Sequence, residues 1–193
     1  FRGVKSLTEE DFIARRVRKL IGEDICYYAM HTNFDVLGMA DAAAERLDLL
    51  ETKVLHVTYE DEIATEGIGR VGKLKGTMSL EELAHFTKEA FDVPSVKVFG
   101  DPETLCCEVA VCPGAGKSLV ENVLHTEADV YVTGDIDHHT GMDLVAQGVC
   151  VIDAGHYGVE KLFVPYMYDY FTKILPECNV IKAIERDPFW VLV

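Results

Sequence analysis

Basic residues are scarce in this chain. Its 193 residues include 18 Lys and Arg against 33 Asp and Glu, which gives a net charge of −15. The acidic residues are spread along the sequence and do not form a tail. Because a field of this sign repels polyphosphate, the composition argues against nucleic acid as a partner.

Long apolar runs are also absent. No run approaches the roughly 18 consecutive apolar residues that a membrane-spanning helix needs, although hydrophobic residues make up 49% of the chain. The mean hydropathy of +0.09 is that of an ordinary folded domain. The sequence has no internal repeat, low-complexity segment or proline-rich linker. We therefore expect one compact unit and no membrane partner.

None of the six cysteines forms the C-x-x-C spacing of a zinc knuckle. Most of them lie in apolar, strand-like contexts, where cysteine behaves as a small hydrophobic residue. A disulfide framework is uncommon at this size, so we expect reduced thiols in a cytoplasmic protein. No signal peptide is visible, and the chain begins at Phe1 without an initiator Met. We therefore expect an N-terminal segment to be missing.

Patterns typical of strands and helices alternate along the chain, which predicts an α/β fold. Thr8, followed by three acidic residues, predicts the start of the first helix, and Ser79 with Glu82 predicts a capping box. The expected helices cover residues 8–22, 38–50, 79–91, 118–124, 142–147 and 163–174, the last of them starting near residue 156. The expected strands cover residues 25–30, 53–59, 96–99, 105–112, 129–132, 149–152 and 180–184.

Two glycine-rich stretches resemble nucleotide loops only in part. Residues 67–72 read G-x-G-x-x-G, but the pattern continues as strand or loop where a Rossmann loop needs a helix. Residues 113–118 contain Gly-Lys-Ser, but Val111 stands where a P-loop has its first glycine. We favour a glycine turn there over a P-loop nucleotide switch, although a small phosphate could rest at such a helix start.

The stretch from residue 149 to 160 predicts a buried strand, a glycine turn and the start of a helix. His156 and Glu160 lie four residues apart, so a helix places them on the same face, one turn apart. At the carboxyl end of a strand in an α/β fold, such a pair could share a metal ion. The alternative is an exposed pair on a helix surface, which spacing alone favours because such pairs are common.

Residues of the metal-binding type follow three expected strands, within residues 31–35, 135–139 and 153–160. Strand ends on one side of a sheet converge, so the three groups could form one site. Imidazole and carboxylate suit zinc, iron or manganese, and a carboxylate can bridge two ions. The alternatives are a rim pair without a ligand role for His138 and His139, and a helix N-cap for Asp35.

Taken in order, these motifs resemble the Nif-three-like family, known as GTP cyclohydrolase 1 type 2 homologues and dinuclear-metal-centre hexameric proteins. The resemblance covers nearly the whole chain. It rests on H-T-N-F-D at residues 31–35, G-R-V-G at 69–72, T-G-D-I at 133–136 with His139 beyond, D-A-G-H at 153–156 with Glu160, and D-P-F at 187–189.

The resemblance implies an α/β, Nif-three-like fold with two similar βα lobes around a metal cleft, formed by residues 1–193 as one N-terminally incomplete unit. Asp35, His156 and Glu160 would bind two divalent ions (zinc, iron or manganese), with Asp35 and Glu160 as bridging candidates. His139 would line the cleft and take part in proton transfer or meet a substrate phosphate. Residues 31–33 would hold the Asp35 loop.

The chain departs from the family pattern in two places. The G-H-H-P motif that supplies further metal ligands is absent, so the present ligands are few for two ions. Residues 38–41 read G-M-A-D where the family usually has Gly-x-Asn-Asp, which predicts a looser turn.

For function, the resemblance implies a metal-dependent hydrolase that acts on a nucleotide-like small molecule. The alternative is a non-catalytic metal-binding scaffold or metal-handling partner protein. The resemblance also implies a homohexamer, a trimer of dimers, with its sites facing an inner cavity.

Overall fold

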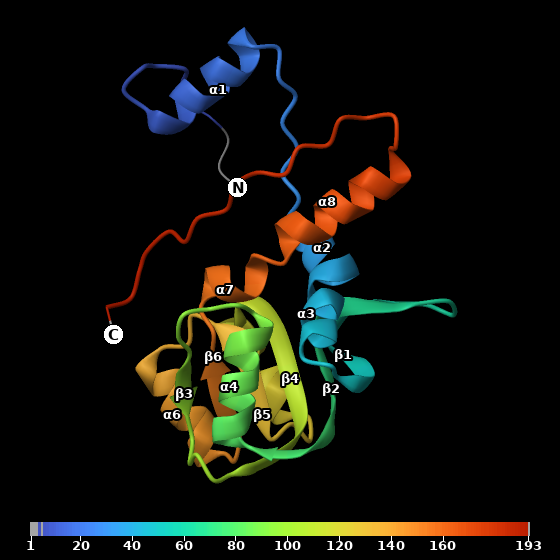
Figure 1. Cartoon of the computed structure of the whole chain (residues 1–193), viewed down its shortest axis with the longest axis vertical. Helices are drawn as coiled ribbons and strands as arrows, with labels where there is room; N and C mark the ends of the chain where they lie inside the picture. Colours follow the sequence, from blue (N-terminus) through green and yellow to red (C-terminus); the bar gives the residue numbers. More distant parts are fainter. Residues whose placement is uncertain (1–3, 5, 193) are drawn as a thin grey trace. The chain divides into compact units, whose positions relative to one another are not determined.

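A computed structural model describes residue 4 and residues 6–192 (Figure 1). Contacts within the chain divide it into two units, residues 1–31 and residues 32–193. The expectation that residues 1–193 form a single unit stays a prediction.

The first unit contains one helix, α1 (Phe12–Gly22). Asp11 is its N-cap, because the Asp11 carboxylate accepts hydrogen bonds from the backbone N–H groups of Ile13 at 2.7 Å and Ala14 at 3.0 Å. The predicted start at Thr8 is therefore wrong. The predicted strand at residues 25–30 is wrong as well, since these residues are irregular and pair with no described strand.

The second unit is built on one six-stranded sheet with the strand order β1-β2-β4-β5-β6-β3. Strands β4, β5 and β6 are parallel, and the remaining neighbours are antiparallel. The predicted α/β class is confirmed, and in residues 32–192 all strands belong to one continuous sheet. The strands are β1 (Leu50–Glu60), β2 (Thr65–Ser79), β3 (Lys97–Phe99), β4 (Leu105–Ala115), β5 (Val130–Gly134) and β6 (Cys150–Asp153).

The centre of the sheet is buried on both faces. Every residue of β5 and β6 is buried, as expected for parallel strands covered by helices, and no alternation with polar residues is seen. The register aligns Val111 with Val132 and Val132 with Ile152. These strands therefore form a fixed platform whose carboxyl ends lie side by side.

Helices cover this sheet, with α4 lying across its strands in Figure 1. The capping box predicted at Ser79 and Glu82 is confirmed, and α6 begins four residues before its predicted start at residue 142. The helices are α2 (Thr32–Phe34), the π-helix η1 (Asp35–Met39), α3 (Ala40–Arg46), α4 (Leu80–Ala90), the 3₁₀ helix η2 (Gly116–Leu119), α5 (Val120–Leu124), α6 (His138–Ala146), α7 (His156–Glu160) and α8 (Phe163–Ile174).

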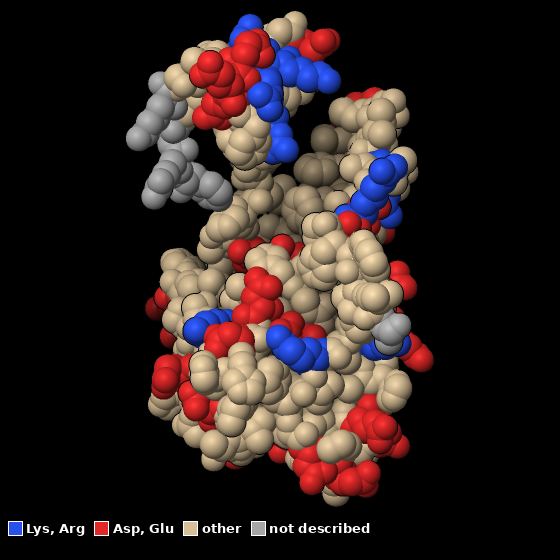
Figure 2. Space-filling view, turned by 90° about the vertical axis from the view of Figure 1, so that its left-hand side faces the viewer, with Lys and Arg blue, Asp and Glu red and all other residues tan. Residues whose placement is uncertain are grey.

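The tail of the chain is irregular. Residues 179–192 form no strand, so the predicted strand at residues 180–184 is wrong. None of the helices formed by the described residues combines the length and apolar character that crossing a membrane requires. Acidic side chains are spread over the face drawn in Figure 2, with smaller groups of basic side chains among them.

An ion pair joins α3 to β2. Arg70, which is 6% exposed, donates from Nε to Asp41 Oδ1 at 2.6 Å and from Nη2 to Asp41 Oδ2 at 2.9 Å. Its Nη1 donates to the carbonyls of Gly67 and Gly69. The G-R-V-G motif thus lies inside a strand, and its arginine fastens the helix that follows the Asp35 turn.

Replacing Arg70 with methionine should lower the free energy of unfolding by about 2–3 kcal/mol, because two carbonyls and Asp41 lose a buried charged donor. Lys75→Met is the matched control, since its ion pair with Asp48 is exposed on both sides and should cost less than about 1 kcal/mol. Urea denaturation measures both values. Equal losses in the two variants would contradict a fastening role for Arg70.

The six thiols should divide into two classes. Cys26, Cys107 and Cys178 are exposed, whereas the other three are buried. Burial raises the pKa of Cys106 to about 12 and, with the charges of Asp35 and Glu160 adding to it, raises the pKa of Cys112 to about 11.

A higher thiol pKa means less thiolate, so at about pH 8 the buried cysteines should resist a thiol reagent such as Ellman's reagent. Three thiols should react quickly in the native protein and six after unfolding in denaturant. Rapid native labelling of Cys106 or Cys112, read by peptide mass spectrometry, would contradict this packing.

Candidate functional site

The candidate site lies where the parallel strands β4, β5 and β6 end. Gly114 lies at the end of β4, Asp135 follows β5, and His156 follows β6. Parallel neighbours end at the same edge of a sheet, so three segments far apart in sequence meet there. The prediction that the segments after residues 134 and 153 converge is confirmed.

His156 connects two carboxylates at this edge. Its Nδ1 lies 2.8 Å from Asp135 Oδ2, and its Nε2 lies 3.3 Å from Glu160 Oε1. The ring is about half exposed. The helical spacing predicted for His156 and Glu160 is present, because both residues belong to α7.

Burial by itself would lower the pKa of His156. The hydrogen bond to Asp135 and the negative charges of Glu160 and Asp135 outweigh this effect, so the pKa of His156 is raised overall. The raised pKa favours a proton on both ring nitrogens, with Nδ1 facing Asp135 and Nε2 facing Glu160. A metal ion at Nε2 would have to displace the proton there, while the hydrogen bond from Nδ1 to Asp135 keeps the orientation of the ring.

Gly114 brings the backbone of β4 directly against this pair. A Cβ atom at position 114 would lie 2.6 Å from Glu160 Oε1 and 3.8 Å from His156 Nε2. The residue also has a φ of +80°, a conformation that side chains disfavour. Any other residue here would strain the backbone and displace the Glu160 carboxylate.

Asp35 is the first residue of the π-helix η1. The segment before it is not a strand, so the predicted strand end at residues 31–35 is wrong, and Asp35 lies within a helical run instead of capping one. The negative charges of Asp35 and Glu160 both add to the raised pKa of Cys112. Single π turns often occur at functional sites, because they redirect a side chain.

Aromatic packing holds the turn that carries Asp35. The Phe34 ring lies 5.2 Å from each of the Phe163 and Tyr166 rings of α8, centroid to centroid. A Cβ at Gly38 would lie 2.6 Å from the Phe34 ring. Of the residues expected to hold this turn, Thr32 and Asn33 are exposed and belong to α2, and His31 belongs to the first unit. Their supporting role stays a prediction.

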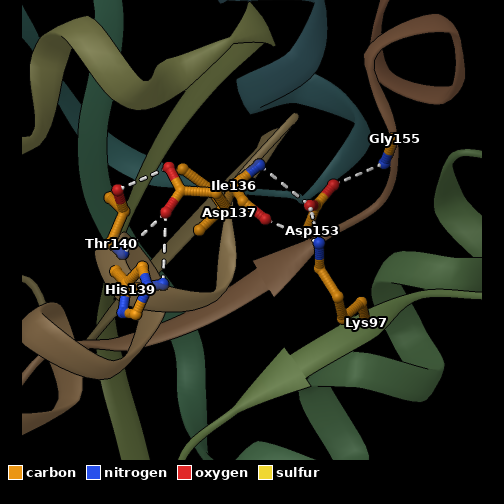
Figure 3. A network of polar contacts seen from close by, with 7 residues as sticks. All are labelled: Lys97, Ile136, Asp137, His139, Thr140, Asp153 and Gly155. Carbon is orange, nitrogen blue, oxygen red and sulfur yellow. Dashed lines mark hydrogen bonds and ion pairs between the residues drawn. The ribbon is translucent and has the colours of Figure 1, made fainter.

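Asp153 anchors the turn that carries His156 (Figure 3). Its buried carboxylate accepts hydrogen bonds from the N–H groups of Ile136 at 3.0 Å and Gly155 at 2.9 Å. Lys97 Nζ lies 2.9 Å from the same carboxylate and donates to the Ile136 carbonyl at 2.6 Å. This network ties the end of β6 to the end of β5 and so fixes the distance between the two turns.

His139 lies in the first turn of α6 (Figure 3). Asp137 caps this helix and accepts from the N–H of His139 at 3.1 Å. The His139 ring packs edge-on against that of His138, with centroids 5.4 Å apart. Neither contact reaches His156 or Glu160, so the role of His139 in proton transfer stays a prediction.

Residues 113–118 do not form a phosphate loop. Strand β4 continues through Ala115, and the Lys117 amine pairs with Asp137 at 2.7 Å. A P-loop lysine must reach a phosphate, whereas this amine meets a carboxylate. The structure therefore favours the glycine turn.

The fit of these residues to a metal ion is partial. Two donors bound to one ion, each about 2.1 Å from it, lie about 3.0–3.4 Å apart, and the 3.3 Å between His156 Nε2 and Glu160 Oε1 matches this spacing. Among residues 4 and 6–192, however, no group of three or more His, Cys, Asp and Glu side chains is arranged to hold an ion. The spacing of one donor pair therefore fits a metal ion, and the binding of an ion by His156, Glu160 and Asp35 stays a prediction.

Sequence reasoning missed the part that three residues play in this site. Gly114 belongs to a stretch interpreted as a glycine turn, and Lys97 lies on a strand far away in sequence. Asp135 was expected only as one member of the metal-type group at residues 135–139, and its hydrogen bond with His156 was not foreseen. Asp135 has a φ of +59°, which is uncommon outside glycine, but no sequence pattern reveals this conformation.

Comparisons with known proteins show which family this chain resembles along its length. A family model described as Duf34/NIF3 (NGG1p interacting factor 3) matches residues 1–188. A protein of Lactococcus lactis named GTP cyclohydrolase 1 type 2 homolog is 33% identical in an alignment of 196 positions that covers 98% of this chain and 73% of that protein. A protein of the same name from Streptococcus pneumoniae is 38% identical in an alignment of 152 positions that covers 75% of this chain.

The chain is shorter than these relatives, and the match spans 55% of the Streptococcus protein. Among solved structures, a Bacillus cereus protein related to NIF3 superposes with a TM-score of 0.91 at 21% identity, covering 100% of this chain and 80% of that one. This likeness confirms the expected α/β, Nif-three-like fold, whereas the two similar lobes around a metal cleft stay a prediction. Because the family model and the Lactococcus relative both match almost the whole length of the chain, the chain belongs to the Duf34/NIF3 family.

Proposed function

We propose that this chain is a metal-binding protein and acts as a metal-dependent hydrolase on a nucleotide-like small molecule. The observation that carries the proposal is the His156–Glu160 pair, whose donor atoms lie 3.3 Å apart at the carboxyl ends of parallel strands. Asp35 would join them, and Asp35 and Glu160 are the carboxylates suited to bridging two ions. The names of the relatives, GTP cyclohydrolase 1 type 2 homologues, support the substrate class.

Zinc, iron or manganese suits this donor set, because imidazole and carboxylate are borderline-to-hard ligands. When bound, two such ions supply Lewis-acid activation of water and of a substrate oxygen. The chain's own part is to keep the donors fixed. Asp135 orients the His156 ring, the backbone at Gly114 leaves room for the Glu160 carboxylate, and His139 is the candidate for proton transfer.

A non-catalytic metal-binding scaffold is the second candidate, because the contacts of His139 are to its neighbours on α6 and not to the His156–Glu160 pair. A screen of phosphoester, nucleotide and cyclic-amide substrates separates the two. Turnover that disappears together with bound metal in His156→Ala supports the hydrolase. Metal retention without turnover on any of them supports the scaffold.

Elemental analysis tests the metal proposal directly. A longer chain that carries a G-H-H-P segment should bind about two transition-metal ions per chain after reconstitution, and Glu160→Gln should lose most of them. Analysis of the 193-residue chain in parallel shows how much the present residues bind alone. His85→Ala, on the exposed face of α4, is the control and should keep its metal. No bound metal in any form would refute the proposal.

Two glycine variants test whether Gly114 makes room for Glu160. Gly114 and Gly148 both have positive φ, at +80° and +93°, so alanine at either position should cost about 1–3 kcal/mol in strain. A Cβ at Gly148 meets nothing within 4 Å, whereas a Cβ at Gly114 meets Glu160. Gly114→Ala should therefore lose metal in the longer chain and Gly148→Ala should retain it. Equal metal content in the two variants would show that the Glu160 carboxylate can move away from a Cβ at position 114, which would contradict the prediction.

A further inference from the structure

A pocket of about 710 Å³ lies beside the turn that carries His156. Its volume is within the roughly 300–1,000 Å³ typical of small-molecule sites. Three stretches of the second unit line it, residues 93–97, residues 153–158 and residues 187–191 of the tail. The His156 side chain is not part of this lining and contacts Asp135 and Glu160 instead. The pocket is therefore separate from the candidate metal site.

The charged side chains that line this pocket have a net negative charge, from two carboxylates and one amine. The one basic residue of the lining, Lys97, is already bound to Asp153 at 2.9 Å and to the Ile136 carbonyl at 2.6 Å. Asp187 adds a further carboxylate. An anionic ligand would meet repulsion here.

Aromatic surface lines the same pocket. It comes from Tyr157 on α7 and from Phe189 and Trp190 on the tail. Phe189 is 64% exposed and Trp190 is 79% exposed, so their rings remain available for contact. Within the lining, α7 approaches Val93 closely, because a Cβ at Gly158 would lie 2.7 Å from Val93 Cγ1. Aromatic faces attract cations through the negative charge of the ring face.

We propose that this pocket binds a small organic cation, such as a quaternary ammonium compound or a protonated aromatic amine. The aromatic side chains contact the apolar body of the ligand, and Asp187 faces its charge. A neutral ligand of the same shape would keep the apolar contacts and lose the electrostatic attraction.

The chain contains one tryptophan, Trp190, so its fluorescence reports on this pocket alone. Choline is the probe, titrated at constant ionic strength against NaCl. Its neutral isostere, 3,3-dimethylbutan-1-ol, has the same shape without the charge. We expect a saturable change in fluorescence with choline and an affinity about three- to thirtyfold weaker for the isostere. No saturable change with choline, or equal affinity for the two compounds, would overturn the proposal.

Two charge variants locate the binding. Asp187→Asn should weaken choline binding about two- to fivefold, in the range of an exposed ion pair. Asp169→Asn removes the same charge from the exposed face of α8 and should have no effect. Equal weakening of choline binding in the two variants would show a general effect of protein charge and overturn the proposed site. Glu160→Gln should still bind choline, so failure of the metal proposal and failure of this one are distinguishable.

Discussion

The parallel pairing of β4, β5 and β6 is the constraint on which the candidate site depends. Each strand enters the sheet in the same direction, so Gly114, Asp135 and His156 emerge at one edge. The strands are buried on both faces and cannot slip without exposing apolar side chains. The distances between the site residues are therefore fixed by the core, before any ligand contributes.

Close backbone approach is the second constraint, and it explains why glycines surround the site. A Cβ at Gly134 would lie 2.4 Å from the backbone nitrogen of His156, and a Cβ at Gly116 would lie 2.1 Å from Thr133 Oγ1. Gly114 touches Glu160 in the same way. The end of each of these strands thus leaves no room for a side chain, which lets the turns pack against one another. The geometry of the His156–Glu160 pair depends on this packing as much as on helical spacing.

Local signals were predictable from the sequence, and signals that need a distant partner were not. The capping box at Ser79 involves groups three residues apart, so the sequence is enough to find it. The apolar runs at residues 25–30 and 180–184 have strand-like composition, but a strand exists only when another strand pairs with it, and none of the described strands does. The first helix begins at Phe12 because the Asp11 carboxylate accepts hydrogen bonds from two backbone N–H groups. Thr8, which is followed by acidic residues, offers a similar capping pattern, so the sequence did not distinguish the two starts.

The features of the candidate site differ in the same way: some follow from local spacing, and others depend on distant partners. The α7 pair follows from four-residue spacing, and its place at a strand end follows from the alternation of strands and helices. The π turn at Asp35 and the positive φ of Asp135 depend on tertiary packing, so no periodicity predicts them. Asp35 was singled out by residue type within residues 31–35 and by the family resemblance, and its role as a metal ligand stays a prediction.

Rigidity of the turn after β6 bears on both proposed sites. Asp153 is tied to Ile136, Gly155 and Lys97, and the Ala154 N–H donates to the Thr133 carbonyl at 2.9 Å. Residues 153–155 line the pocket, and His156, the next residue along the chain, contacts Asp135 and Glu160. A ligand couples two sites only if the segment between them has a second arrangement to adopt. A turn held by this many buried hydrogen bonds resists such a change, so occupation of the pocket should leave the His156–Glu160 spacing unchanged.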